Sequence, residues 1–395
     1  MPATQFTAGD IGEKHKLHGL DHLRALAIVS VLCFHYQFFG HPDWERGRIA
    51  GFGWTGVDLF FVLSGFLIAG QLFEMVASGK AISLPQFFIK RFFRIIPPYL
   101  FVLLLYIAFP VVHEWGHLSP LWKYFTFTLN FGQDLSKYGT FSHVWSLCIE
   151  EQFYLLLPLA FCFFGYFKAG KKSYYLILAL FVAGFAVRLL SWKYFAAPYL
   201  SADDFGARWN EYVYYPTYNR LDGLLVGVSI AGLFTFYPKV KEWVNRWCYV
   251  LLAVGVFMLI VAFQLCRVYA SFNTAIYGFP VISAGYGLVL AACVSPSCIF
   301  FRIKSKVTSL IATLSYSIYL SHKIIIHLVQ KLLESFGVAK NSITCMMICM
   351  FCVIAGALVI RYLIEKPSLR VRDRMLKEMH RFKVPRPRAI PSHGG

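Results

Sequence analysis

Charged residues are scarce in this sequence. They make up 15% of its 395 residues, whereas hydrophobic residues make up 58% and aromatic residues 18%. A soluble domain carries about 25% charged residues and about 45–50% apolar ones. Too few polar side chains are present to cover the surface of a water-soluble fold of this size. The composition excludes a soluble globular protein and indicates a chain that has the lipid bilayer as its solvent.

The sequence also lacks the signatures of common soluble enzyme sites. It contains no phosphate-binding glycine-rich loop, no G-x-S-x-G elbow and no H-E-x-x-H zinc motif. Its ten cysteines lie mostly within apolar runs, and the C-x-x-C of Cys349 and Cys352 has no second pair or histidine nearby. We expect neither a disulfide framework nor a metal site. The polar N-terminus does not resemble a cleaved signal peptide, so membrane insertion would depend on the first apolar segment.

Apolar segments long enough to cross a bilayer recur along the whole chain. A membrane-spanning helix needs about 20 mostly apolar residues. The sequence predicts an all-α polytopic membrane bundle of about ten helices over residues 21–366, preceded by residues 1–20 and followed by a basic tail, 367–395. Aromatic residues in 113–142 would also allow a re-entrant or interfacial helix there. The predicted spans are 23–39, 53–73, 95–112, 143–164, 174–191, 216–235, 248–265, 275–294, 308–330 and 342–362.

Basic residues alternate between the segments that connect these spans. Twenty-four Lys and Arg residues fall in one set of alternate segments, which includes both chain ends, and nine fall in the opposite set. Because cytoplasmic segments are enriched in Lys and Arg, both termini are predicted to be cytoplasmic. This placement explains the net charge of +18, and no nucleic-acid-binding motif accompanies that charge. We expect the basic tail to be flexible or to lie on anionic lipid.

Ionisable residues inside apolar spans are costly and are therefore functional candidates. Arg24 and His35 are eleven residues apart in the first span, so they lie on one helix face, about 16 Å apart. His35 is the side chain best suited to take a proton from a sugar hydroxyl near neutral pH. The alternatives are helix packing for His35 and interfacial anchoring for Arg24. Asp58, at the level of His35, either holds a histidine's tautomer or pairs with another helix.

A basic segment precedes the predicted third span. Its cations Lys90, Arg91 and Arg94 lie at the mouth of that span, where Arg91 and Arg94 are one helical turn apart. Guanidinium groups in this position would suit phosphate groups, since they can bind phosphate through two parallel hydrogen bonds. Ordinary anchoring of a span by cytoplasmic cations explains the same pattern.

Two adjacent carboxylates, Glu150 and Glu151, interrupt the apolar fourth span. No Lys or Arg lies within a turn of them, so they have to meet a cation on another helix or face a wet cavity. Arg220 is a candidate partner. Arg361 and Glu365 are four residues apart and are expected to pair with each other. The remaining polar or aromatic candidates within spans are Trp145, Arg220, Asp222, Tyr316, Tyr319 and His322.

Several of these residues belong to blocks that occur in a fixed order. The blocks are Arg24-x10-His35, Gly56-Val57-Asp58 through Phe66, Arg91-x-x-Arg94-Ile95-x-Pro97-x-Tyr99, Trp145-Ser146-Leu147 with Glu150 and Glu151, Ser315-Tyr316 through His322, and Glu365-Lys366-Pro367. In this order they resemble the membrane acyltransferases of acyltransferase family 3, over nearly the whole chain.

The resemblance implies transfer of an acyl group, usually acetyl from acetyl-CoA, to a hydroxyl of a surface or exported glycan. It implies essential roles for Arg24 and His35 and a role for the basic segment on the donor side. With the residues above, the catalytic candidates become His35, Arg24, Asp58, Glu150 and Glu151. The candidates for binding the CoA donor are Lys90, Arg91, Arg94 and Tyr99.

The leading expectation is therefore an O-acyltransferase of the bacterial inner membrane. Acyl-CoA would be its co-substrate, with no tightly bound cofactor, and its acceptor a glycan or glycolipid such as lipopolysaccharide O-antigen or exopolysaccharide. The sequence ends about 30 residues after Pro367, as expected of a stand-alone member without the extra domain of many relatives. An extracytoplasmic partner protein would then be one way to hold the acceptor, and a homo-oligomer is a further expected association. The rival hypotheses are a transporter or flippase of glycan intermediates and a non-catalytic scaffold.

Overall fold

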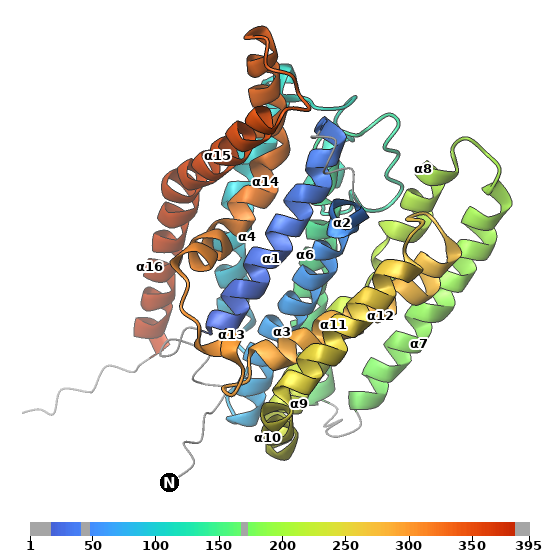
Figure 1. The fold of residues 1–395 in the computed structure, drawn as a ribbon. Helices are drawn as coiled ribbons and strands as arrows, with labels where there is room; N and C mark the ends of the chain where they lie inside the picture. Colours follow the sequence, from blue (N-terminus) through green and yellow to red (C-terminus); the bar gives the residue numbers. More distant parts are fainter. Residues whose placement is uncertain (1–16, 41–47, 167–172, 384–395) are drawn as a thin grey trace, which may run out of the picture.

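The structure, a computed structural model, describes residues 17–40, 48–166 and 173–383. Within these ranges it is a bundle of long helices without a β-strand (Figure 1). Nine helices of the described chain are long and apolar enough to cross a membrane, and the bent pair α9 and α10 raises the number to ten if it counts as one span. The predicted polytopic helical bundle is confirmed. Its long helices are α1 (His18–Tyr36), α3 (Gly56–Ala77), α4 (Leu84–Ala108), α6 (Trp145–Tyr166), α7 (Ser173–Ser191), α9 (Asp222–Phe236), α11 (Cys248–Leu265), α12 (Phe279–Cys293), α14 (Lys306–Ser335) and α15 (Ile343–Ile360).

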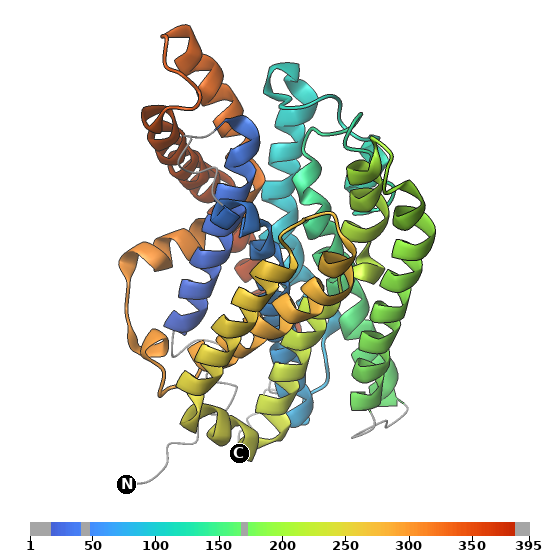
Figure 2. The ribbon, with the colours of Figure 1, turned by 45° about the vertical axis from the view of Figure 1, so that its right-hand side comes forward.

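The bundle has two different ends. We call the end where α1 begins and α3 ends the basic end, and the opposite end, covered by residues 109–144 and 192–221, the loop end (Figures 1 and 2). The short helix α10 (Pro238–Arg246) lies at the basic end. A final helix, α16 (Lys366–Lys383), follows α15 through a π-helical turn and also ends there. The described chain thus begins and ends on one side of the bundle, as an even number of crossings requires.

Helix α4 differs from the predicted third span. It begins at Leu84 rather than near residue 95 and runs through Pro97 and Pro98, so the predicted basic loop 87–99 is helical. Each proline removes one backbone hydrogen bond of the helix. Prolines are tolerated inside membrane helices that pack against neighbouring helices. Beside Pro97 and Pro98, the Tyr316 hydroxyl of α14 donates a hydrogen bond to the Ile95 carbonyl at 2.7 Å, which connects α14 to α4.

The segment between α4 and α6 is an ordered cover over the loop end. It contains the five-residue helix α5 (Leu121–Phe125) and none of the longer re-entrant or interfacial helix that the sequence allowed. The Glu114 carboxylate accepts hydrogen bonds from the Tyr106 hydroxyl at 3.2 Å and from the Phe141 N–H at 3.1 Å. The Thr140 hydroxyl donates to the Trp115 carbonyl at 2.7 Å. These bonds tie the start of the segment to its end.

The basic tail is helical where the structure describes it. Residues 366–383 form α16, which packs against α4. Residues 1–16 and 384–395, which belong to the predicted terminal segments, lie outside the described residues. The expected Arg361–Glu365 pair is confirmed.

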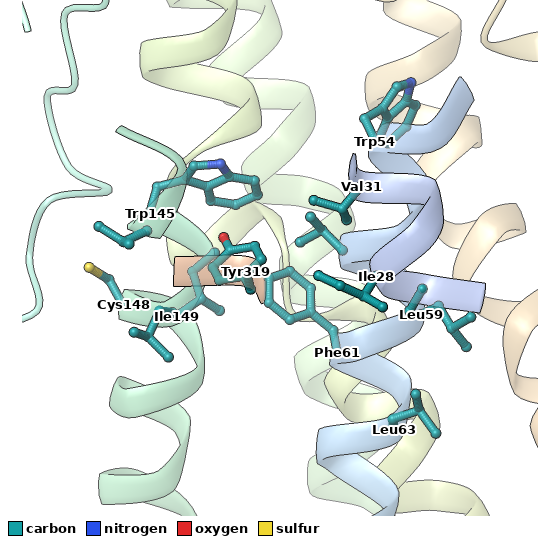
Figure 3. Close-up of a cluster of buried hydrophobic side chains, with 14 of the residues drawn as sticks. Ile28, Val31, Trp54, Leu59, Phe61, Leu63, Trp145, Cys148, Ile149 and Tyr319 are labelled. Atoms are coloured by element: carbon teal, nitrogen blue, oxygen red, sulfur yellow. The ribbon is translucent and has the colours of Figure 1, made fainter. Parts of the chain in front are cut away.

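Helices α3 and α9 make the most intimate contact of the bundle. A Cβ atom on Gly65 would lie 2.2 Å from the Leu224 carbonyl oxygen, and one on Gly227 would lie 2.2 Å from the Val62 carbonyl oxygen. Small residues permit such close backbone approach between membrane helices, where van der Waals packing is a main source of stability. The same helix α3 also packs on α1 and α6, and apolar side chains of all three meet in the core (Figure 3).

We expect Gly65→Ala to destabilise the protein by about 1–3 kcal/mol, because the added methyl group has to push two backbones apart. Gly70→Ala in the same helix is the matched control, since its added Cβ meets no atom within 4 Å. That control should be neutral or slightly stabilising because alanine favours helix. Thermal unfolding in detergent measures both, and equal unfolding temperatures would contradict this account of the contact.

Candidate active site

A cavity of about 560 Å³ opens at the loop end between α1, α6 and α14. Aromatic rings form most of its wall, and His35 from α1 lines it. Phe38 and Trp115, which also line the cavity, are partly exposed to solvent. Its lining consists of Val31, Phe34, His35, Phe38, Gly51, Trp54, Val57, Trp115, Leu135, Gly139, Ser142, His143, Trp145, Asn210, Tyr214, Tyr215, Tyr269, Tyr319 and Lys323.

His35 is hydrogen-bonded to His322 of α14, with 2.8 Å between His35 Nδ1 and His322 Nε2. His322 Nδ1 lies 3.0 Å from the Ile318 carbonyl and 2.9 Å from the Tyr319 carbonyl. Carbonyl oxygens only accept, so His322 Nδ1 carries the proton and its Nε2 is the acceptor for His35. His35 Nδ1 therefore carries a proton as well, and His35 Nε2 is left with a free lone pair. A neutral imidazole in this tautomer can act as a base through Nε2.

A third histidine, His143, completes the cluster. Its Nε2 donates to the Tyr319 carbonyl at 2.9 Å, while its Nδ1 is buried without a hydrogen-bond partner. Its ring centroid lies 5.8 Å from that of His35 and 4.9 Å from that of His322. The Tyr319 hydroxyl donates to the His143 carbonyl and lies 2.6 Å from the Ser146 hydroxyl. Of the three histidines only His35 is half-buried rather than buried, so it is the one best placed to meet a substrate.

His143 was absent from the sequence-based candidates, although it lies two residues before the Trp145-Ser146-Leu147 block. His322 was among them, but without a specific role. The structure brings both to His35 from helices that lie far away along the chain. No group of three or more potential ligands in the described residues is arranged to hold a metal ion.

Asp58 does not contact a histidine, contrary to one of the two alternatives for it. Both of its carboxylate oxygens accept hydrogen bonds from Arg220 Nη2, at 2.9 and 3.0 Å, and both side chains are almost fully buried. Arg220 is therefore also not the partner of Glu150 or Glu151. It lies in the turn before α9, which starts at Asp222 rather than near residue 216.

The Arg220 guanidinium lies under the aromatic wall of the cavity. Its carbon is 5.9 Å from the ring centroid of Trp54, 5.7 Å from that of Trp145, 4.6 Å from that of Tyr214 and 4.0 Å from that of Phe279. Cation–π contacts of this kind strengthen when they are removed from water. The neighbouring Asp222 pairs with Arg188 of α7. The Arg220–Asp58 pair therefore connects the cavity wall to α3, and the Asp222–Arg188 pair connects it to α7.

Glu150 and Glu151 belong to a second polar cluster, nearer the basic end. The Glu150 carboxylate accepts hydrogen bonds from the Ser64 hydroxyl at 2.9 Å and the Tyr154 hydroxyl at 3.0 Å. Arg91 lies within electrostatic range of both glutamates. Arg91 belongs to α4, so these carboxylates do have a cation from another helix nearby, which is one of the two predicted arrangements.

Three arginines gather at this cluster. Arg24 of α1 is within electrostatic range of Arg91 and Arg94 of α4. Arg91 donates to the Gln71 side chain at 3.2 Å and lies 5.6 Å from the Tyr154 ring centroid. Arg94 is exposed and Arg24 and Arg91 are half-buried, so solvent and ligands can reach the group.

The other donor-side candidates occupy different positions. Lys90 is exposed on the outer surface of α4. The Tyr99 hydroxyl donates to the Tyr124 carbonyl at 3.0 Å, which connects α4 to the cover segment. Tyr316, described above, bonds to the backbone of α4. Tyr99 and Tyr316 therefore have structural hydrogen bonds in this fold.

The geometry defines a membrane-embedded helical protein with a histidine-based site at one end and an arginine cluster toward the other. A family model described as an acyltransferase domain matches residues 17–362. The chain belongs to this family, acyltransferase family 3.

Two curated relatives illustrate the similarity. The chain is 30% identical over 322 residues to the O-acetyltransferase OatA of Staphylococcus aureus (strain NCTC 8325 / PS 47), covering 78% of this chain and 50% of the relative. It is 30% identical over 332 residues to the peptidoglycan O-acetyltransferase OatA of Listeria monocytogenes, covering 80% of this chain and 50% of that protein. The chain thus spans about half the length of the curated relatives it matches. No solved structure matches it.

Arg220→Met is expected to destabilise the protein by about 3–5 kcal/mol, because it leaves the Asp58 carboxylate buried without its cation. The double variant Arg220→Met/Asp58→Leu should regain most of that stability, since apolar side chains can replace a buried ion pair. Chemical unfolding in detergent measures each variant. As a control, Arg208→Met breaks the exposed Arg208–Asp204 pair and should change little. A double variant no more stable than the single one would refute this account of the pair.

Proposed function

We propose that this protein transfers an acyl group from acyl-CoA to a hydroxyl of a cell-surface glycan. The observation that carries the proposal is His35, held by His322 as an Nδ1–H tautomer in an aromatic-walled cavity. Aromatic rings stack on sugar faces, and a neutral imidazole is a suitable base for a sugar hydroxyl. The relatives support O-acetylation as the reaction. Acceptors of this class include peptidoglycan, named for the Listeria relative, and lipopolysaccharide O-antigen or exopolysaccharide.

The proposed orientation places the loop end outside the cytoplasm. The Lys and Arg asymmetry supports this assignment, as does the location of both ends of the described chain at the basic end (Figure 1). In a bacterial inner membrane, acyl-CoA would then approach the arginine cluster from the cytoplasm, and the glycan would enter the cavity from outside.

In the proposed reaction the glycan hydroxyl loses its proton to His35 Nε2 while its oxygen attacks the thioester carbonyl. The carbon–sulfur bond breaks, and the CoA thiolate takes the proton from His35 as it leaves. His35 is thereby returned to its starting tautomer. His322 does not change its protonation state, and its role is to keep Nε2 of His35 free. His35 is the catalytic residue of this scheme and His322 is a positioning residue.

The donor would bind at Arg24, Arg91 and Arg94. Guanidinium groups suit the phosphates of CoA, and these three lie together near the basic end. Arg24 and His35 lie on one face of α1, about 16 Å apart. The extended arm of CoA would bridge this distance and bring the thioester to His35.

Radiolabelled acetyl-CoA and membranes that contain the protein test the reaction directly. Label should appear in glycan with the wild type, and His35→Ala should lose about 10²–10⁴-fold in rate, the usual contribution of base catalysis. His322→Leu, which has no acceptor for His35 Nδ1–H, should lose about 10–100-fold. His322→Gln, whose side-chain oxygen can accept that hydrogen bond, should recover part of the loss. A transporter or scaffold would label no glycan, and a correctly inserted, fully active His35→Ala protein would refute the mechanism.

Arg94→Ala should weaken CoA binding by about 1.5–3 kcal/mol, the value of one charge-assisted hydrogen bond to phosphate. Lys80→Ala, which removes an exposed cation from the preceding loop, serves as the matched control and should bind CoA normally. Equilibrium binding of CoA to the purified proteins measures both. If the folded Arg94→Ala protein bound CoA as tightly as the control, the donor site would lie elsewhere.

A further inference from the structure

Lys323 lines the same cavity as His35 and had no place among the sequence-based candidates. It follows His322 on α14, and only 4% of it is exposed. Among the described residues that line the cavity, it is the only Lys, Arg, Asp or Glu. A ligand in this cavity therefore meets aromatic rings, neutral polar groups and one ammonium group.

The ammonium group of Lys323 is poorly satisfied by the protein. Its Nζ lies 3.4 Å from the Ser142 hydroxyl, 3.9 Å from Glu114 Oε1 and 5.0 Å from the ring centroid of Trp115. The 3.9 Å separation gives charge compensation but no hydrogen bond. Glu114 Oε1 already accepts the hydrogen bonds from Tyr106 and Phe141 described above. Since an ammonium group has three N–H donors, Lys323 keeps donor capacity for a ligand.

The chemistry of that ligand follows from what the cavity offers. Lys323 donates one long hydrogen bond, to the Ser142 hydroxyl at 3.4 Å. Burying an ammonium group with so few hydrogen bonds is costly, and a bound anion would offset that cost more than a neutral hydroxyl would. Phosphate sites generally gather several donors or a guanidinium fork, whereas this cavity presents one ammonium group. A single carboxylate on a sugar matches one ammonium group among aromatic rings.

We propose that Lys323 binds the carboxylate of an acidic sugar, so that the acceptor is a glycan with uronic acid or carboxyalkyl groups. This inference rests on the proposed function, because it concerns the cavity in which the acceptor would react. Lys323 selects the acceptor and takes no part in the proton transfer at His35.

The test compares two acceptors that differ in one group: a uronic-acid oligosaccharide and the same oligosaccharide with its carboxylate converted to the primary amide. Equilibrium binding to the purified protein is measured first, without acyl-CoA. The wild type should bind the acid about 10–100-fold more tightly than the amide, as one hydrogen-bonded charge pair provides. Lys323→Met should bind both alike, at the affinity that the wild type has for the amide. Lys323→Arg should keep a preference for the acid.

Lys331→Met is the matched control, because Lys331 lies on the same helix, is exposed and does not line the cavity. It should behave as the wild type. A wild-type protein without preference for the acid would overturn the proposal, even if Lys323→Met did not fold. An equal loss of turnover on both acceptors in Lys323→Met, with unchanged binding preference, would also overturn it and would indicate a role in the reaction itself. Failure to label any glycan from acetyl-CoA would overturn the proposed function alone, since the binding result does not depend on it.

Discussion

A charge buried among apolar helices is stable only when another helix supplies its partner, because lipid offers none. This constraint sets the rotation and height of the helices around α3. Asp58 of α3 is held by Arg220 in the turn before α9, and Asp222 of α9 is held by Arg188 of α7. The glycine-lined contact between α3 and α9 brings these partners within reach. The packing of small residues and the pairing of charges therefore depend on each other, and together they fix the wall of the histidine cavity.

The histidine cluster and the arginine–glutamate cluster are separated by an apolar layer. On α1, Ile28 and Val31 lie between Arg24 and His35, and they meet Phe61 of α3 and Ile149 of α6 in that layer (Figure 3). These four side chains are almost fully buried, so the layer between the two clusters is apolar. The layer separates a cation cluster that solvent can reach from the histidines at the loop end. An acyl donor held by the arginines has to extend through or beside this layer to reach His35.

The sequence was sufficient for features that depend on helix length and periodicity. Runs of apolar residues predict the spans, and the local spacing predicts the shared face of Arg24 and His35 and the Arg361–Glu365 pair. The choice of partners between helices was not predictable in this way. Asp58 could have met a histidine or an arginine, and only the rotation of α3 against α9 decides for Arg220. His143 and Lys323 were missed because each becomes informative only when helix packing brings the turn before α6 and helix α14 to the cavity that His35 lines.

The backbone carbonyl oxygen of Tyr319 sets the orientation of two of the three histidines. The Tyr319 carbonyl accepts one hydrogen bond from His322 Nδ1 and another from His143 Nε2. It thereby sets the tautomers of two imidazoles, and through His322 that of His35. Catalytic histidines are often oriented by a carboxylate, which also supplies a negative charge. In this site the neutral imidazole of His322 orients His35 in place of a carboxylate. The cavity therefore gains no negative charge from the group that orients His35. Among the described residues that line the cavity, the charged side chain is that of Lys323, whose remaining N–H donors suit an anionic acceptor.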